Sequence, residues 1–383
     1  MDLTAQQWSA INSQLYAMQS KLLNRLQENE HFYIQRLHLL EVARQVNTRI
    51  AEVEFELSRA FTYWDTIFDI TTQRYVLGKL LAGCEVIAQD ALRIDHPAVK
   101  LLVPCVVFGD RGAGASFLRE GIRTPYNAKI PMALIQIPYG RLVAKYDLFS
   151  LCHEVGHDLT YRLSLDKQMI PILKMALKNA GAETIISDLF CTGITEILPD
   201  LCGLLKCGLA QASSLRDILS VPKDLAFIIS TRDPHPSPYI RVLLGFENCR
   251  QMWGKGVCDE MEKDWIEMYP LDNVPSNTLK ILKSMRKYLP VVSKTLLGSR
   301  LSVLKGKKIP DLFDVSVISP AVIERAVRSI RSGTLNLKGL PPCAQLAVFR
   351  TIRDQAKLSE DMLDKIMRKW LIKLGQTRTT RNI

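Results

Sequence analysis

The sequence of 383 residues predicts a predominantly α-helical protein of the α+β class, with one small β-sheet. Two observations support this fold class. From Gln6 to about Thr71 the chain contains no Pro or Gly, and apolar residues recur at spacings of three and four, which is typical of amphipathic helices. Between Ala98 and Pro138, short segments rich in β-branched residues alternate with turn-forming residues, which is typical of strands. Beyond Pro138 the helical spacing returns.

The first predicted unit is a long helical arm or hairpin over residues 1–97. Charged residues are interleaved with its apolar stripe, as in a coiled coil. A stripe of this kind packs against the rest of its own chain, against a second copy of the chain or against a protein partner. The sequence leaves these alternatives open.

The second predicted unit, residues 98–268, begins with the sheet. Its strand candidates are Val99–Phe108 and Met132–Pro138. The segment Gly109–Ser116 between them is rich in glycine, but it lacks the Gly-Lys-Ser/Thr ending of a phosphate-binding loop. We therefore expect this segment to be a loop or hairpin connection.

The third predicted unit is a basic helical region, residues 276–383, which follows a linker at Tyr269–Ser276 marked by two prolines. It contains 22 Lys and Arg against 7 Asp and Glu, whereas the preceding residues contain 28 against 32. Basic residues such as Lys280 and Lys283 recur at helical spacing among Leu, Ile and Val, which favours a solvated helix face. Binding to nucleic acid or to an acidic protein is a less favoured alternative, and binding to a membrane surface is a third.

The sequence indicates a cytoplasmic protein without a membrane span. Its first residues contain no basic stretch followed by an apolar segment, as a secretory signal would, and no run of about 18 apolar residues occurs. The nine cysteines are odd in number and lie in apolar surroundings. We therefore expect reduced thiols within the core and not a disulfide framework.

The segment that points to chemistry runs from His153 through Glu154 to His157, with the sequence HEVGH. On a helix, two histidines four residues apart lie on one face and can reach one metal ion, while Glu154 points to the same side. Zn²⁺ accepts neutral histidine nitrogens and carboxylate oxygens and leaves one position for water. Glu154 is then suited to take a proton from that water as a general base.

Two acidic pairs compete to supply the third metal ligand. Glu196 and Asp200 are four residues apart, so Glu196 can bind the metal while Asp200 accepts the ring N–H of a ligand histidine. Glu183 and Asp188 are five residues apart, about 140° around a helix, and cannot share these two roles from one straight helix. The spacing favours Glu196.

Pro199 lies between Glu196 and Asp200 and removes one helical hydrogen bond. A helix that starts near Thr195, a suitable N-cap, tolerates this proline because the first turn has few internal hydrogen bonds to lose. We expect such a helix start.

Downstream, His235 lies in a turn-rich segment and Arg241 lies near the start of the next helix. A histidine beside the zinc can stabilise the oxyanion of the transition state, and Arg241 is suited to pair with Asp200 or another buried acid. A surface histidine followed by a structural arginine is the alternative.

The segments HEVGH, EILPDLCG and HPSPYIRV follow the order found in the gluzincin metallopeptidases. The chain resembles thermolysin-like enzymes in the first two segments and soluble relatives of the CAAX endopeptidases in the third. The resemblance covers about residues 98–250 and implies a zincin-like core. It also implies His153, His157 and Glu196 as zinc ligands. Glu154 is then the general base, and Asp200 is the carboxylate that supports a ligand histidine.

In such enzymes an edge strand upstream of the histidine helix pairs with extended substrate, and Met132–Pro138 is the candidate for this role. Pro199 departs from the small residue usual at its position. The membrane helices of the CAAX group are absent from the sequence, so the resemblance does not imply prenylated membrane substrates.

The sequence thus predicts a zinc metallopeptidase that acts on a protein or peptide, with Zn²⁺ as its cofactor. The alternative is a catalytically inactive, zinc-stabilised scaffold that binds partners through the helical arm and the basic C-terminal region. The intact Glu154 favours the enzyme, because this residue is not needed to bind metal.

Overall fold

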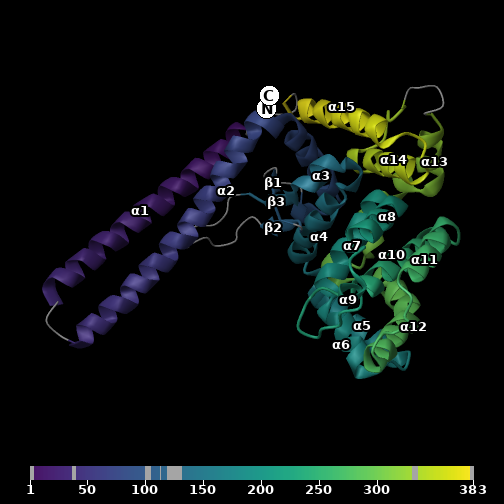
Figure 1. Ribbon diagram of the computed structural model, residues 1–383, viewed down its shortest axis with the longest axis horizontal. Coiled ribbons are helices and arrows are strands. Elements are labelled where there is room, and N and C mark those ends of the chain that lie inside the picture. Colours follow the sequence, from purple (N-terminus) through teal and green to yellow (C-terminus); the bar gives the residue numbers. More distant parts are fainter. Residues whose placement is uncertain are drawn as a thin grey trace. The chain divides into compact units, whose positions relative to one another are not determined.

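The computed structural model describes residues 4–36, 40–99, 105–112, 114–118, 132–329 and 335–379. Most of these residues are helical and a small sheet is present, as the sequence predicts (Figure 1). The first part of the chain forms α1 (Ala5–Arg36), α2 (Leu40–Leu92), η1 (Pro97–Val99), β1 (Val106–Asp110), β2 (Ser116–Leu118) and β3 (Leu134–Pro138). Then follow α3 (Tyr139–Val143), η3 (Lys145–Asp147), α4 (Ser150–Arg162), α5 (Leu165–Asn179), α6 (Thr184–Thr192), α7 (Ile194–Cys207), α8 (Leu209–Ile218) and α9 (Lys223–Ala226). The last part forms α10 (Pro238–Trp253), α11 (Val257–Met268), α12 (Ser276–Gly298), η4 (Ser302–Leu304), η5 (Ile309–Leu312), η6 (Val315–Ile318), α13 (Pro320–Arg328), α14 (Pro342–Asp354) and α15 (Glu360–Thr379).

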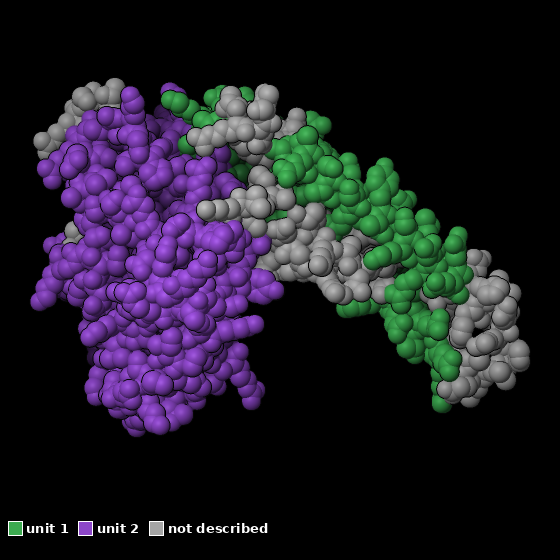
Figure 2. Space-filling view, turned by 180° about the vertical axis from the view of Figure 1, so that it is seen from behind, with its two compact units in different colours: residues 1–85, 102–138, 372–383 green, residues 86–101, 139–371 purple. Residues whose placement is uncertain are grey.

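The chain divides into two compact units (Figure 2). Unit 1 consists of residues 1–85, 102–138 and 372–383, and unit 2 consists of residues 86–101 and 139–371. This division differs from the predicted boundaries near residues 97 and 276. The strands belong with the long N-terminal helices, and the basic helices up to residue 371 belong with the histidine helix α4.

In unit 1, helices α1 and α2 lie side by side and run in opposite directions (Figure 1). Ile11, early in α1, belongs to the same buried cluster as Ile67 of α2. Arg25, later in α1, lies 3.9 Å from Glu52, which is earlier in α2. The cluster also contains residues of α2, of strands β1 and β3, and of the segment just before β3: Ile70, Val106, Phe108, Leu134 and Met132. The apolar stripe of the predicted arm is therefore partly buried against the sheet of its own unit.

The sheet has three strands in the order β1-β3-β2. Strand β3 pairs in parallel with β1 along its whole length and antiparallel with β2 over Leu134–Gln136. The expectation that Met132–Pro138 offers a free edge to substrate is wrong, because β3 is the central strand and its neighbours occupy both of its edges. Strand β2 has only three residues, too few for sequence alternation to reveal it. Lys100–Pro104, in the first strand candidate, lie outside the described residues.

Side chains of α2 occupy the outer edge of β1. Gln73 accepts the N–H of Gly109 at 2.7 Å and donates to its carbonyl at 2.8 Å. Glu85 accepts the N–H of Val107 at 3.1 Å, while Arg74 donates to the Val107 carbonyl at 2.8 Å and pairs with Glu85 at 2.6 Å. Unpaired strand edges invite pairing with other chains, and these contacts remove that opportunity at β1.

In unit 2 the helices pack around α4, α5, α7 and α10. The segment between α11 and α12 has the predicted turns, but α12 packs back on α5 and α10, so no compact part ends there. Leu282 and Met285 of α12 are buried, whereas Lys280 and Lys283 are exposed. This arrangement is the solvated basic helix face that the spacing favours.

A buried arginine connects the C-terminal region to the rest of unit 2. Arg350 of α14 is fully buried and donates to Asp147, to Asp217 at 2.5 Å and to Asp354 at 3.1 Å. It also donates to the hydroxyl of Ser213 at 2.9 Å. Because a charge removed from water must be paired, α14 is bound to η3 and α8 by this network.

Among the helices in the described part of the chain, none is long and apolar enough to cross a membrane. The side chains of the nine cysteines are buried, as their apolar surroundings predict.

Candidate metal centre

Helices α4 and α7 touch at Gly156 and Pro199. A Cβ atom added to Gly156 would lie 2.6 Å from Cα and 2.9 Å from the carbonyl oxygen of Pro199. Only a glycine permits this approach, because non-bonded carbon atoms do not come closer than ordinary van der Waals contact. The contact places the histidines of α4 against the carboxylates of α7.

His153, His157 and Glu196 converge at this contact. The Nε2 atoms of the two histidines are 3.1 Å apart, His153 Nε2 is 3.4 Å from Glu196 Oε2, and His157 Nε2 is 3.5 Å from Glu196 Oε1. Zinc bonds of about 2.0–2.1 Å in a tetrahedral arrangement place two donor atoms about 3.4 Å apart. The chemistry of the three donors and their spacing fit one zinc ion.

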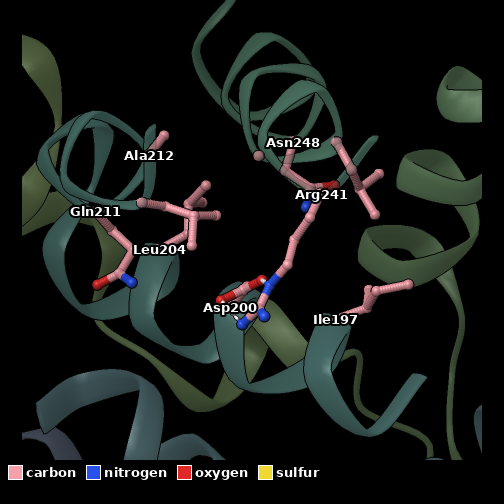
Figure 3. Close-up of a pocket in the computed structure, with 10 residues that line it drawn as sticks. Ile197, Asp200, Leu204, Gln211, Ala212, Arg241 and Asn248 are labelled. Carbon is pink, nitrogen blue, oxygen red and sulfur yellow. Dashed lines mark hydrogen bonds and ion pairs between the residues drawn. The ribbon is translucent and has the colours of Figure 1, made fainter. Parts of the chain in front are cut away.

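Asp200 contacts His153 at Nδ1, and Arg241 in turn contacts Asp200. Asp200 Oδ1 lies 2.8 Å from Nδ1 of His153, so Nε2 is the nitrogen that faces His157 and Glu196. The guanidinium of Arg241, on α10, points at the Asp200 carboxylate from the pocket in Figure 3 and donates to its two oxygens at 2.5 and 3.0 Å. Hydrogen bonding of this kind fixes the orientation of a metal-binding imidazole.

Arg241 also contacts two of the three converging residues directly. Its Nη2 lies 3.2 Å from Glu196 Oε2 and 3.4 Å from His153 Nε2. The Glu196 carboxylate therefore divides its oxygens, with Oε2 toward Arg241 and His153 and Oε1 toward His157.

The two histidines differ in protonation because their neighbours differ. Burial opposes a charge on His153, but the adjacent Asp200 and Glu196 outweigh this cost and raise its pKa to about 9. Burial, reinforced by the charge on His153, lowers the pKa of His157 to about 4. At neutral pH and without a metal ion, these pKa values make the imidazole of His153 protonated and that of His157 neutral.

The three carboxyl groups of the site also differ in the direction of their pKa shifts. Although burial opposes their charge, Arg241 and His153 hold the pKa of Asp200 well below its usual range, and a hydrogen bond from His153 together with the charge of Arg241 lowers the pKa of Glu196. Glu154 is also buried, and burial raises its pKa to about 7. A carboxylate with a pKa near 7 is suited to exchange protons at neutral pH.

His235 lies at the exposed rim of the site. Its Nε2 is 3.6 Å from Glu196 Oε1, its Nδ1 is 2.7 Å from Asp233, and its side chain is 61% exposed. The loop before α10 is held there by Pro236, which packs on Gly193 at the start of α7: a Cβ added to Gly193 would lie 2.5 Å from the proline ring.

The other acidic pair lies elsewhere. Glu183 is 3.7 Å from Lys280 and Asp188 is 3.2 Å from Lys174, and all four side chains are largely exposed. Neither belongs to the group that gathers around the histidines. Of the candidate third ligands, the fold brings Glu196 to His153 and His157.

Helix α7 begins at Ile194, near the expected start, but its N-cap is Gly193 and not Thr195, which lies inside the helix. The sequence patterns considered above give Gly156 no role, and they mark Pro199 only as the loss of one helical hydrogen bond. A glycine inside a helix costs about 1 kcal/mol relative to alanine, and this cost is the signal that could have indicated a close helix contact.

Comparisons of the chain with protein-family models, curated proteins and solved structures give no match.

Proposed function

We propose that this protein is a zinc-dependent hydrolase that cleaves peptide bonds. The observation that supports the proposal best is the triangle of His153, His157 and Glu196, whose donor atoms have the spacing of a zinc shell. Glu154 follows His153 directly, is buried, and has a pKa of about 7. A metal shell with an adjacent carboxylate of this kind is the arrangement used for hydrolysis of carbonyl compounds.

Each residue has a distinct part in the proposed reaction. When bound, zinc supplies a Lewis acid that acidifies water and polarises a carbonyl group. Glu154 takes the proton from the attacking water and passes it to the leaving nitrogen. Asp200 keeps Nε2 of His153 directed at the ligand set, and Arg241 keeps Asp200 ionised. His235, with its imidazole exposed at the rim, is placed to donate to the developing oxyanion.

The test separates metal binding from catalysis. The wild-type chain is expected to bind one zinc ion through this triangle, measured by competition with a chromophoric chelator, and to cleave members of a diverse peptide library. Glu154→Gln should keep this zinc and lose at least about 100-fold in cleavage rate, the usual contribution of a general base. Glu183→Gln, the same change at an exposed glutamate, is the control and should keep both.

Two results would contradict the proposal. One is a folded His153→Gln chain that binds zinc as tightly as the wild-type chain does. The other is cleavage by Glu154→Gln at the wild-type rate.

A second candidate is a binding protein in which these residues form an ion network without turnover. The observation that favours it is charge balance, because the charges on His153 and Arg241 offset those on Glu196 and Asp200 without a metal ion. This candidate predicts zinc-independent folding and no cleavage that depends on Glu154.

A further inference from the structure

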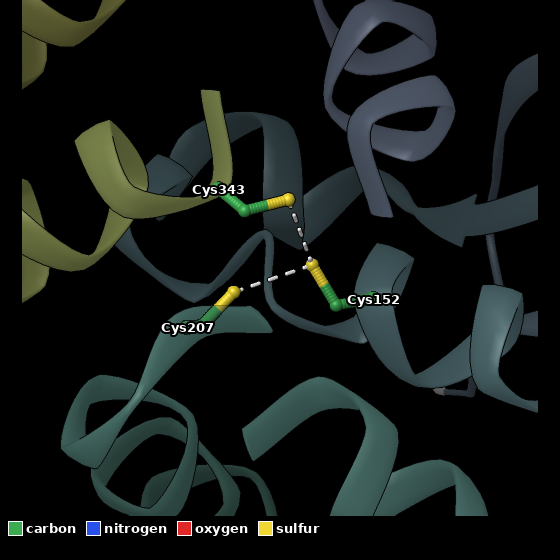
Figure 4. A group of neighbouring side chains, drawn as sticks. All are labelled: Cys152, Cys207 and Cys343. Carbon is green, nitrogen blue, oxygen red and sulfur yellow. Dashed lines mark hydrogen bonds between the residues drawn. The ribbon is translucent and has the colours of Figure 1, made fainter. Parts of the chain in front are cut away.

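Three buried cysteines that have no part in the proposed function meet beside the start of α4. Cys152 is the third residue of α4, Cys207 ends α7 and Cys343 is the second residue of α14. The Sγ atom of Cys152 is 3.5 Å from that of Cys207 and 3.8 Å from that of Cys343 (Figure 4). The three sulfurs lie within 4.8 Å of one another and their residues are at most 2% exposed.

These distances fit a metal ion better than a disulfide. A disulfide requires sulfurs about 2.05 Å apart, and it joins only two of them. Zinc–sulfur bonds of about 2.3 Å in a tetrahedral arrangement place two sulfurs about 3.8 Å apart. Both contacts of Cys152 are close to that value, and the sulfurs of Cys207 and Cys343 lie within 4.8 Å of each other.

The surroundings suit an anionic cluster. The N–H of Cys343 donates to Asp90 at 2.9 Å, which fixes the start of α14 beside α2. Lys206, next to Cys207, donates to the carbonyls of Asp90 and Arg93 at 2.7 and 2.5 Å, so its ammonium group is held at Asp90, whose carboxyl group contacts Cys343. Three thiolates with a divalent ion carry one negative charge, which this ammonium offsets.

We propose that Cys152, Cys207 and Cys343 bind one thiophilic d¹⁰ metal ion, Zn²⁺ or Cu⁺, as a second metal site separate from the histidine triangle. Soft sulfur ligands select these ions. On binding, each thiol that becomes a ligand releases its proton to solvent, and no electron is transferred. The ion would join the starts of α4 and α14 to the end of α7. In sequence, Cys207 and Cys343 lie 55 and 191 residues after Cys152.

The site would stabilise the residue next to His153. Because Cys152 precedes His153 directly, a metal ion on Cys152 would fix the first turns of α4 relative to α7 independently of the histidine ligands. This proposal does not depend on peptidase activity.

The experiment uses an optical signal that only sulfur ligands give. The full-length chain, reduced and kept free of oxygen, is titrated with Co²⁺ in one arm and with Cu⁺ in another. Sulfur-to-metal charge-transfer absorption in the ultraviolet is expected to saturate at one ion per chain in at least one arm. Histidine and glutamate ligands do not produce this absorption, so His153→Gln should retain it.

Matched variants identify the ligands. Cys343→Ser and Cys207→Ser should each lose most of the absorption. Cys202→Ser should keep it, because Cys202 is equally buried in α7 but lies outside this group. Circular dichroism establishes that each variant is folded, and two ligand variants are used so that one folding failure does not decide the result.

The proposal is overturned if the folded, reduced wild-type chain shows no charge-transfer absorption with either ion. It is also overturned if the absorption survives in a folded Cys343→Ser or Cys207→Ser chain. A Cys152–Cys207 disulfide in protein isolated under reducing conditions would contradict it as well.

Discussion

The close contact between α4 and α7 makes Gly156→Ala the most informative substitution. The added Cβ would lie 2.6 Å from Pro199 Cα, 2.9 Å from its carbonyl oxygen and 3.0 Å from its Cβ, whereas ordinary contact begins at 3.4 Å. Two of these atoms belong to the backbone, so no side-chain rotation relieves the overlap. The helices must separate by about 0.8 Å.

The effect on stability and the effect on metal binding should differ in size. Overpacking of this kind costs about 1–3 kcal/mol, but alanine recovers about 1 kcal/mol of helix propensity over glycine. The free energy of unfolding should therefore fall by roughly 0–2 kcal/mol. A shift of about 0.8 Å exceeds the tolerance of about 0.2 Å in metal–ligand distances, so zinc affinity should fall at least about tenfold.

Zinc affinity is measured by competition with a chromophoric chelator, and unfolding by urea with the metal removed. Gly298→Ala is the control, because the Cβ added to this helical glycine meets no heavy atom within 4 Å. It should leave zinc affinity unchanged. A folded Gly156→Ala chain that binds zinc as tightly as wild type would refute the argument that this contact sets the ligand geometry.

Three further predictions concern charge. Asp200→Asn should weaken zinc binding by about 10–100-fold and lower the titration midpoint of His153 in the metal-free protein, which NMR can follow. In the metal-free protein the folded pKa of His153, about 9, exceeds the unfolded value of 6.5, so its contribution to stability is complete below pH 6.5 and is lost as the pH rises toward 9. Urea unfolding should show a loss of roughly 3 kcal/mol over this range that is absent from His153→Gln. Arg350→Ala should cost about 3–5 kcal/mol in urea unfolding, because Arg350 is fully buried and its loss leaves the buried Asp147 with a more distant partner, Arg141 at 3.8 Å. Arg353→Ala, at a partly exposed arginine, should cost less than about 1 kcal/mol; equal losses would contradict this explanation.

The sequence predicts the helices well where their periodicity is long and local. Residues 5–36 and 40–71 form the expected long helices because apolar spacing and the lack of Pro and Gly are properties of these segments themselves. Helix α2 continues to Leu92, past Gly78 and Gly83 and beyond the segment in which this pattern holds. The position of β3 between β1 and β2 could not be predicted, because strand order depends on partners that are distant in sequence. The division into two compact units could not be predicted for the same reason, since composition does not show which helices pack together.

In the candidate site, too, the features that depend on spacing within one helix could be predicted, whereas those that depend on contacts between distant segments could not. The spacing of His153 and His157, and of Glu196 and Asp200, is local to a helix and could be predicted. The pairing of Arg241 with Asp200 was suggested by residue type alone. The convergence of Cys152, Cys207 and Cys343 could not be predicted, because no pair of them has a metal-site spacing in the sequence.

Pro199 shows why a departure from an expected pattern can be part of the geometry. It lies between Glu196 and Asp200, and the closest approach of the two helices therefore falls between these carboxylates. As a result each nitrogen of His153 has its own carboxylate, with Glu196 at 3.4 Å from Nε2 and Asp200 at 2.8 Å from Nδ1. Any side chain at residue 156 would lengthen both distances together. Zinc affinity and the pKa of His153 should consequently fall in the same variants, although one is a property of the metal-bound site and the other of the metal-free site.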